Sequence, residues 1–178
     1  MKPLRLAKLL ATLFLLLAAA GVICLWFAGG NTGRWAHRSS VTIDRPTAEV
    51  FPWLHEPERM KRWMTGFQET RILTEGGLRV GARSIDVIES GGERYEMETE
   101  ITALEQNRLL TARIVHESFT SLVSYELEEL DGRTTVTYSC ETRFAPFFLR
   151  ILAPLIGRAA ANQLEQSLAN LRSVIEAS

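Results

Sequence analysis

The C-terminal part of the chain carries an apolar stripe that needs a partner surface. Beyond Pro146, apolar side chains recur every three or four residues, which places them on one face of a helix. These side chains are Leu149, Leu152, Ile156, Ala160, Leu164, Leu168, Leu171 and Ile175. A proline inside a helix removes a backbone hydrogen bond, so Pro154 predicts a kink or a break, with the uninterrupted part running from Leu155 almost to Ala177. Such a stripe needs a sheet to cover.

The preceding residues have the pattern of a sheet. Strands are predicted over residues 70–74, 82–89, 94–104, 109–117, 119–130 and 134–144. Turn sequences separate several of them, namely Gly76-Gly77, Gly91-Gly92, Gln106-Asn107 and Asp131-Gly132. Connections this short predict one antiparallel meander. Between Glu96 and Ile101, acidic residues alternate with Met97, Thr99 and Ile101, so one face of the sheet should meet water.

One more strand and two short helices are predicted before this meander. Ser40–Ile43 alternates polar and apolar residues as a strand does, and it must pair at an edge or close the sheet. Pro46 or Thr47 can begin one helix and Pro57 a second one. The sequence therefore predicts an α+β fold in which a curved antiparallel sheet of about seven strands wraps around a long C-terminal helix.

The first thirty residues are of a different kind. Residues 9–30 carry no charge, and about 22 residues at roughly 1.5 Å each reach about 33 Å, enough to cross a hydrocarbon core. We therefore expect one transmembrane helix. A signal peptide is the alternative, because Ala28-Gly29-Gly30 resembles a cleavage site, although cleavable apolar cores usually run about 7–15 residues.

The basic residues that flank this segment predict its orientation. Lys2, Arg5 and Lys8 precede it, and Arg34 and Arg38 follow it, which favours a cytoplasmic N-terminus and a C-terminal domain outside the cytoplasm of a single-pass cell-membrane protein. The expected division is an anchor or uncleaved signal over residues 1–30, a linker over 31–38 and a folded domain over 39–178.

Charge argues against one class of partner. The first thirty residues hold three basic side chains and no acid, whereas the rest holds 17 basic and 21 acidic side chains. Nucleic acid binding needs a concentrated basic face, so no nucleic acid partner is expected. The oligomeric state is not predicted.

Several motifs resemble one superfamily. The stretch Val41–Phe51, followed by Trp53 and Trp63, resembles the opening of the SRPBCC superfamily, which includes START-like and polyketide cyclase/dehydrase-like proteins. Residues 104–110 resemble the turn between two central strands there, and the likeness covers about residues 39–177. It implies a helix-grip fold with a cavity between the sheet and the long C-terminal helix, a cavity that in this superfamily often takes lipids or other hydrophobic molecules.

Metal and catalytic chemistry have little support. His37, His55 and His116 lack the spacing of metal ligands, so neither a metal nor another cofactor is expected. His55 precedes Glu56 and Pro57 and is interpreted as a surface helix end. His116 shares strand parity with apolar residues and is a weak candidate for an acid or base.

The first functional hypothesis is a membrane-tethered domain, held by residues 9–30, that binds a hydrophobic small molecule or lipid in that cavity. A cyclase or dehydrase acting on a polyketide-like substrate is the second hypothesis, and a filled domain acting through protein contacts is the third; binding is favoured over catalysis. Strand parity, aromatic character and the apolar stripe of the C-terminal helix select the candidate ligand-binding residues. They are Trp53, Trp63, Phe67, Tyr95, Met97, Ile114, His116, Phe119, Val123, Tyr125, Tyr138, Leu164 and Leu168.

Overall fold

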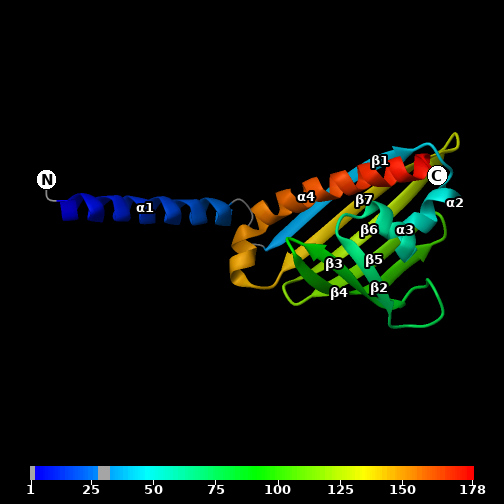
Figure 1. The fold of residues 1–178 in the computed structure, drawn as a ribbon, viewed down its shortest axis with the longest axis horizontal. Coiled ribbons are helices and arrows are strands. Elements are labelled where there is room, and N and C mark those ends of the chain that lie inside the picture. The colour runs from blue at the N-terminus through cyan, green and yellow to red at the C-terminus, as the bar shows by residue number, and fades with distance from the viewer. Residues whose placement is uncertain (1–2, 28–32) are drawn as a thin grey trace.

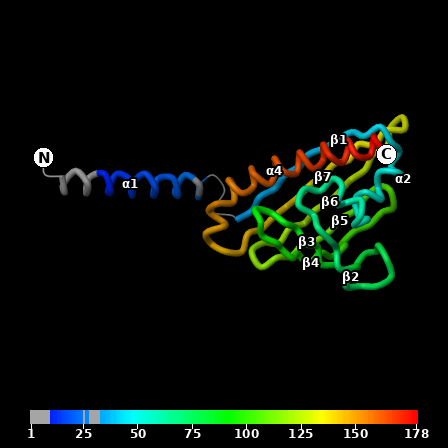
Figure 2. The backbone as a smooth tube through the Cα atoms, in the orientation of Figure 1, coloured from blue at the N-terminus to red at the C-terminus, as the bar shows by residue number. Residues whose placement is uncertain are grey.

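A computed structural model describes residues 3–27 and 33–178 of the chain (Figures 1 and 2). Its elements, in chain order, are α1 (Pro3–Leu25), β1 (Arg34–Ile43), α2 (Thr47–Val50), the 3-10 helix η2 (Phe51–Leu54), α3 (Pro57–Trp63), β2 (Phe67–Ile72), β3 (Arg83–Ser90), β4 (Glu93–Glu105), β5 (Leu109–His116), β6 (Phe119–Leu130), β7 (Arg133–Phe144) and α4 (Phe147–Glu176). Figure 1 shows α4 lying across the sheet, α3 beside it and α1 extending away from both.

The seven strands form one antiparallel sheet in the order β1-β7-β6-β5-β4-β3-β2. The predicted meander is thereby confirmed, and the first strand pairs with β7 at an edge, as expected. Asp131 and Gly132 connect β6 to β7 with φ angles of 53° and 73°, and this pair of left-handed residues is what a tight hairpin between twisted strands requires.

Two strands, β1 and β2, begin earlier in the sequence than predicted. β1 starts at Arg34, within the segment expected as a linker, because β7 continues far enough to pair Arg34 with Arg143. β2 starts at Phe67, next to a register shift between Phe67 and Glu69. The Gly76-Gly77 pair lies in a long connection between β2 and β3, not in a tight hairpin.

The short helices and α4 follow the predicted order. α2 and η2 are continuous in sequence, and α3 begins at Pro57. α4 does not break at Pro154, which lies inside it. Figure 1 shows the orange N-terminal part of α4 turned away from the axis of its red C-terminal part, and a bend of this kind is what an internal proline produces.

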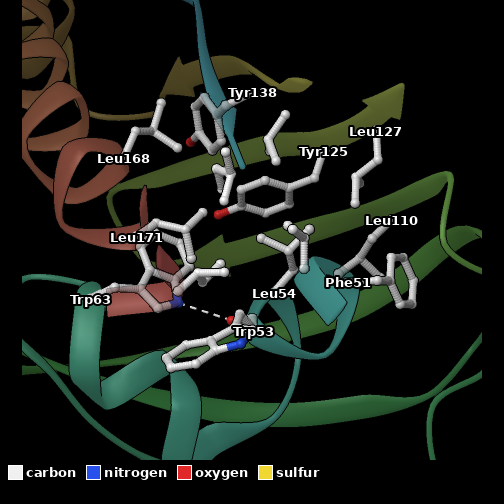
Figure 3. Packing of buried hydrophobic residues seen from close by; sticks show 14 of the residues in the cluster. Phe51, Trp53, Leu54, Trp63, Leu110, Tyr125, Leu127, Tyr138, Leu168 and Leu171 are labelled. Carbon is white, nitrogen blue, oxygen red and sulfur yellow. Dashed lines mark hydrogen bonds between the residues drawn. The ribbon is translucent and has the colours of Figure 1, made fainter. Parts of the chain in front are cut away.

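The main core lies between the sheet, the C-terminal half of α4 and the short helices. Leu168, Leu171 and Ile175 of α4 are buried with Val136 and Tyr138 of β7. Trp63 of α3 completes this cluster, and Figure 3 shows its indole nitrogen donating to the carbonyl oxygen of Trp53, at 2.9 Å. The space between this part of α4 and the sheet is therefore filled by side chains.

The expected transmembrane helix over residues 9–30 is not supported. α1 ends at Leu25, and residues 28–30 lie outside the described residues. Among the residues described, no helix is both long enough and apolar enough to cross a membrane.

Candidate functional site

A pocket of about 280 Å³ opens between the short helices and the inner face of the sheet. The helical side of the pocket is formed by η2 and α3, and its other side by β2 to β6. Apolar side chains predominate in it, and they include Leu54, Met60, Met64, Phe67, Ile72, Leu78, Ile88, Met97, Ile101, Leu110, Ile114 and Val123. A concave apolar cavity of this size with few polar groups is typical of a small-molecule site.

Methionines contribute strongly to the pocket wall. Met60 and Met64 are one turn apart at α3, and Met97 lines the pocket from β4. Together they are three of the four methionines in the chain. Because a methionine side chain is unbranched and flexible, this wall can adjust to ligands of different shape.

One carboxylate lies in this apolar wall. Asp86 of β3 accepts a hydrogen bond from the Thr70 hydroxyl on Oδ1 and one from the Thr99 hydroxyl on Oδ2, each at 2.7 Å. The three residues sit on neighbouring strands β2, β3 and β4, and all three line the pocket. The carboxylate is therefore fixed in orientation by both of its neighbouring strands.

Tyr125 of β6 brings a phenol to the same pocket. Its ring packs edge-on against Trp63, with 6.5 Å between ring centroids, and against Tyr138, at 5.2 Å. Burial raises the pKa of Tyr125 well above its ordinary value, and electrostatic interactions with Cys140 and Asp86 raise it further. Figure 3 shows the Tyr125 hydroxyl pointing toward Trp63 and Leu171. The phenol thus stays protonated and keeps its donor.

His55 ends η2, as predicted, but it lines the pocket and is not a surface residue. It is partly buried, and its ring lies 5.3 Å from that of Phe51. Burial lowers the pKa of His55, Arg59 lowers it further, and Glu56 opposes both effects. A neutral imidazole is therefore favoured at the pocket wall.

The structure divides the sequence-predicted site residues into three groups. Phe67, Met97, Ile114, Val123 and Tyr125 line the pocket. Trp53, Trp63, Tyr138 and Leu168 are buried in the main core, and Leu164 packs against it. Binding by any of these residues remains a prediction.

The third group lies elsewhere on the sheet. The His116 ring lies 6.1 Å from the Tyr95 ring and 5.2 Å from the Phe119 ring. His116 Nδ1 accepts a hydrogen bond from the Ser118 backbone amide, at 3.2 Å, in the β5–β6 hairpin. None of these three predicted residues lines the pocket, including the weak catalytic candidate His116.

The position of the pocket corrects a second expectation. A cavity was expected between the sheet and the C-terminal helix, but no residue of α4 lines this pocket. The buried side chains of Leu168 and Leu171 occupy that space instead. Met60, Met64, Asp86 and His55 are pocket residues that strand parity and aromatic content did not select.

The fold and pocket together define a helix-grip protein of the SRPBCC superfamily. Residues 34–176 match the family described as polyketide cyclase / dehydrase and lipid transport, and the chain belongs to this family. No curated protein matches the chain.

Solved structures share the fold at low sequence identity. Ara h 8.0201 is 15% identical with a TM-score of 0.64, over 82% of this chain and all (100%) of that chain. A protein from Thermus thermophilus is 18% identical with a TM-score of 0.64, over 80% of this chain and 98% of that one. A conserved protein from Geobacillus kaustophilus is 14% identical with a TM-score of 0.67, over 81% of this chain and 97% of that one. At such identities the likeness concerns the fold alone.

Proposed function

We propose that this protein binds a hydrophobic small molecule or lipid in the pocket between α3 and the sheet. The observation that carries the proposal is the open volume of about 280 Å³ within an apolar wall. An engineered cavity of about 150 Å³ holds benzene. The pocket is therefore large enough for a molecule, or part of one, about the size of two fused rings.

The wall is suited to binding more than to a fixed catalytic arrangement. Its methionines adapt to shape, and its polar side chains are few. Family membership supports the same proposal, because the family description includes lipid transport. A cyclase or dehydrase activity is the second candidate, and it is favoured by one observation: Asp86 and His55, both able to exchange protons, line one pocket.

A pocket-filling substitution tests the binding proposal. Ala112 of β5 lines the pocket, and in Ala112→Phe the added ring needs roughly the volume that holds benzene, about half of the space. Ala36→Phe makes the same change at an exposed site on β1. The measurement is native mass spectrometry of the full chain from its own host, followed by extraction of bound molecules.

We expect a stoichiometric hydrophobic molecule with the wild-type chain and Ala36→Phe, and its loss from Ala112→Phe. Molecules that adhere to other apolar surfaces remain with all three chains, so the comparison isolates the pocket. Circular dichroism checks that each variant is folded. Equal amounts of the same molecules in all three proteins, or none in any, would contradict the proposal.

Location at a membrane is a separate part of the proposal. The described apolar side chains of α1 are exposed, as are Phe147 and Phe148 at the start of α4, and the Phe147 ring lies 6.1 Å from that of Trp26. Exposed apolar surface of this extent supports contact with lipid. Fractionation of cells that express the full chain or a chain without residues 1–30 tests it, and recovery of both in the soluble fraction would count against it.

A further inference from the structure

Among the described residues, Asp86 has no arginine partner, unlike several glutamates of the neighbouring strand β4. On the opposite face, Glu96, Glu98 and Glu100 pair with Arg71, Arg83 and Arg113. Within residues 33–178, which contain the whole sheet, no ion pair involves Asp86. Its two partners are the neutral hydroxyls of Thr70 and Thr99.

Those two hydroxyls leave part of the carboxylate unused. An ionised carboxylate offers about four lone-pair sites to donors, and each oxygen of Asp86 accepts one side-chain hydrogen bond here. Charge in an apolar environment is costly unless it is paired or hydrogen-bonded. The pocket therefore contains an acceptor with free capacity and an unbalanced negative charge.

The remaining polar groups do not balance that charge. Burial lowers the pKa of His55, so this side chain is favoured as neutral. The Arg83 guanidinium is bound to Glu98, on the opposite face of the sheet. Among residues 33–178 no side chain gives Asp86 a third hydrogen bond or an opposite charge, so a ligand that carries a donor or a cation can bind there.

We propose that the ligand of this pocket is a compact apolar molecule that carries one hydrogen-bond donor, a hydroxyl or an amine, which binds to the Asp86 carboxylate. This inference rests on the proposed binding function and specifies its ligand class. Tyr125 lines the same pocket, but its hydroxyl points toward Trp63 and Leu171 (Figure 3), so the assignment rests on Asp86 alone.

Four probes of one size test this assignment on the full chain by equilibrium dialysis. Naphthalene has no polar group, 2-naphthol is a neutral donor, 2-naphthylmethylamine is a cationic donor and 2-naphthoate is an anion. A hydrogen bond to a charged group changes affinity by roughly tenfold to a hundredfold. We expect both donors to bind at least about tenfold more tightly than naphthalene, and naphthoate to bind most weakly. The ratio of the affinities of 2-naphthylmethylamine and 2-naphthol shows whether the positive charge strengthens binding beyond the hydrogen bond.

Asp86→Asn keeps the size of the side chain and removes its charge. This variant should lose about tenfold or more in affinity for 2-naphthylmethylamine while its affinity for naphthalene is unchanged. Asp131→Asn is the matched control, because it makes the same change at an exposed hairpin position where asparagine also tolerates the φ of 53°. Thermal unfolding confirms that both variants are folded.

The outcomes separate this inference from the proposed function. Equal binding of all four probes, or an unchanged preference in Asp86→Asn, would overturn the donor assignment and leave the binding function standing. Binding of no probe, together with no co-purified molecule in the native mass spectrum, would overturn both.

Discussion

Gly157 of α4 packs directly against Trp35 of the first strand. A Cβ atom built on Gly157 would lie 2.3 Å from both Cδ1 and Nε1 of Trp35 and 2.7 Å from its Cγ. The indole is a rigid ring, and it also stacks on His37 at a centroid distance of 5.7 Å with 6° between the planes. Gly157→Ala therefore forces the helix or the ring to move.

Two opposing effects set the size of the change. Replacing glycine by alanine inside a helix stabilises it by about 1 kcal/mol. Overpacking costs about 1–3 kcal/mol, and an approach this close to a ring places the cost at the upper end of that range. We expect a net loss of about 1–2 kcal/mol, which lowers the melting temperature by about 2–8 °C in a domain of this size.

Thermal and urea unfolding of the full chain, followed by circular dichroism, measure this loss. Trp35→Ala provides the control background because it removes every ring atom that the new Cβ would meet. There, Gly157→Ala should stabilise the protein by its helix propensity alone, about 1 kcal/mol. The same loss in both backgrounds would refute the steric explanation, because the penalty would then not depend on the indole.

Three further substitutions test local interactions. Burial lowers the pKa of His55 below its ordinary 6.5, so the unfolded chain takes up this proton at a higher pH than the folded chain does. The free energy of unfolding should therefore fall as the pH drops below 6.5. In His55→Gln, urea unfolding measured between about pH 7.5 and about pH 5 should lack this part of the pH dependence. Trp63→Phe removes the donor to the Trp53 carbonyl and should cost about 1–3 kcal/mol in thermal unfolding, whereas no measurable loss would show that the carbonyl finds another donor. Hydrogen bonds from the backbone amide and hydroxyl of Thr47 lower the pKa of Glu129 below its ordinary 4.5. The stability that this carboxylate contributes is therefore present above pH 4.5 and declines as the pH falls below it. Glu129→Gln should be less stable at neutral pH and should lack that decline in an acid titration.

The sequence predicts most of the sheet because its strands alternate and its turns are specific. In β4 the acids face the arginines while Met97 and Thr99 face the pocket, as the alternation predicts. Strand ends are less predictable because pairing partners determine them. Arg34 joins a strand only because Arg143 lies opposite it. α4 continues through Pro154 because Ala153 and Gly157 are buried on either side of it, and tertiary packing supports helices beyond their local propensity.

The candidate site is only partly visible in the sequence. Parity alone identifies Met97, Ile114 and Val123 as inward-facing. The run around Asp86 is ambiguous, since Ile88 shares the parity of Asp86 while Val87, which is just as apolar, has the other parity. Strand alternation therefore cannot show that the carboxylate points inward. The contribution of α3 depends on how the helix docks on the sheet, which is a tertiary property.

The distribution of side-chain sizes explains why the pocket lies beside α4 and not beneath it. Under the C-terminal half of α4 the sheet presents Tyr125 and Tyr138, and these fill the space together with Trp63. Farther along the sheet the pocket-lining residues on and next to β3 to β5 include several small ones. They are Ala82, Ser84, Thr99 and Ala112. Short helices with flexible methionines cover this part, so the missing volume is not refilled. Because these small residues lie outside the buried cluster under α4, substitutions among them can change the volume and shape of the pocket while that core is kept.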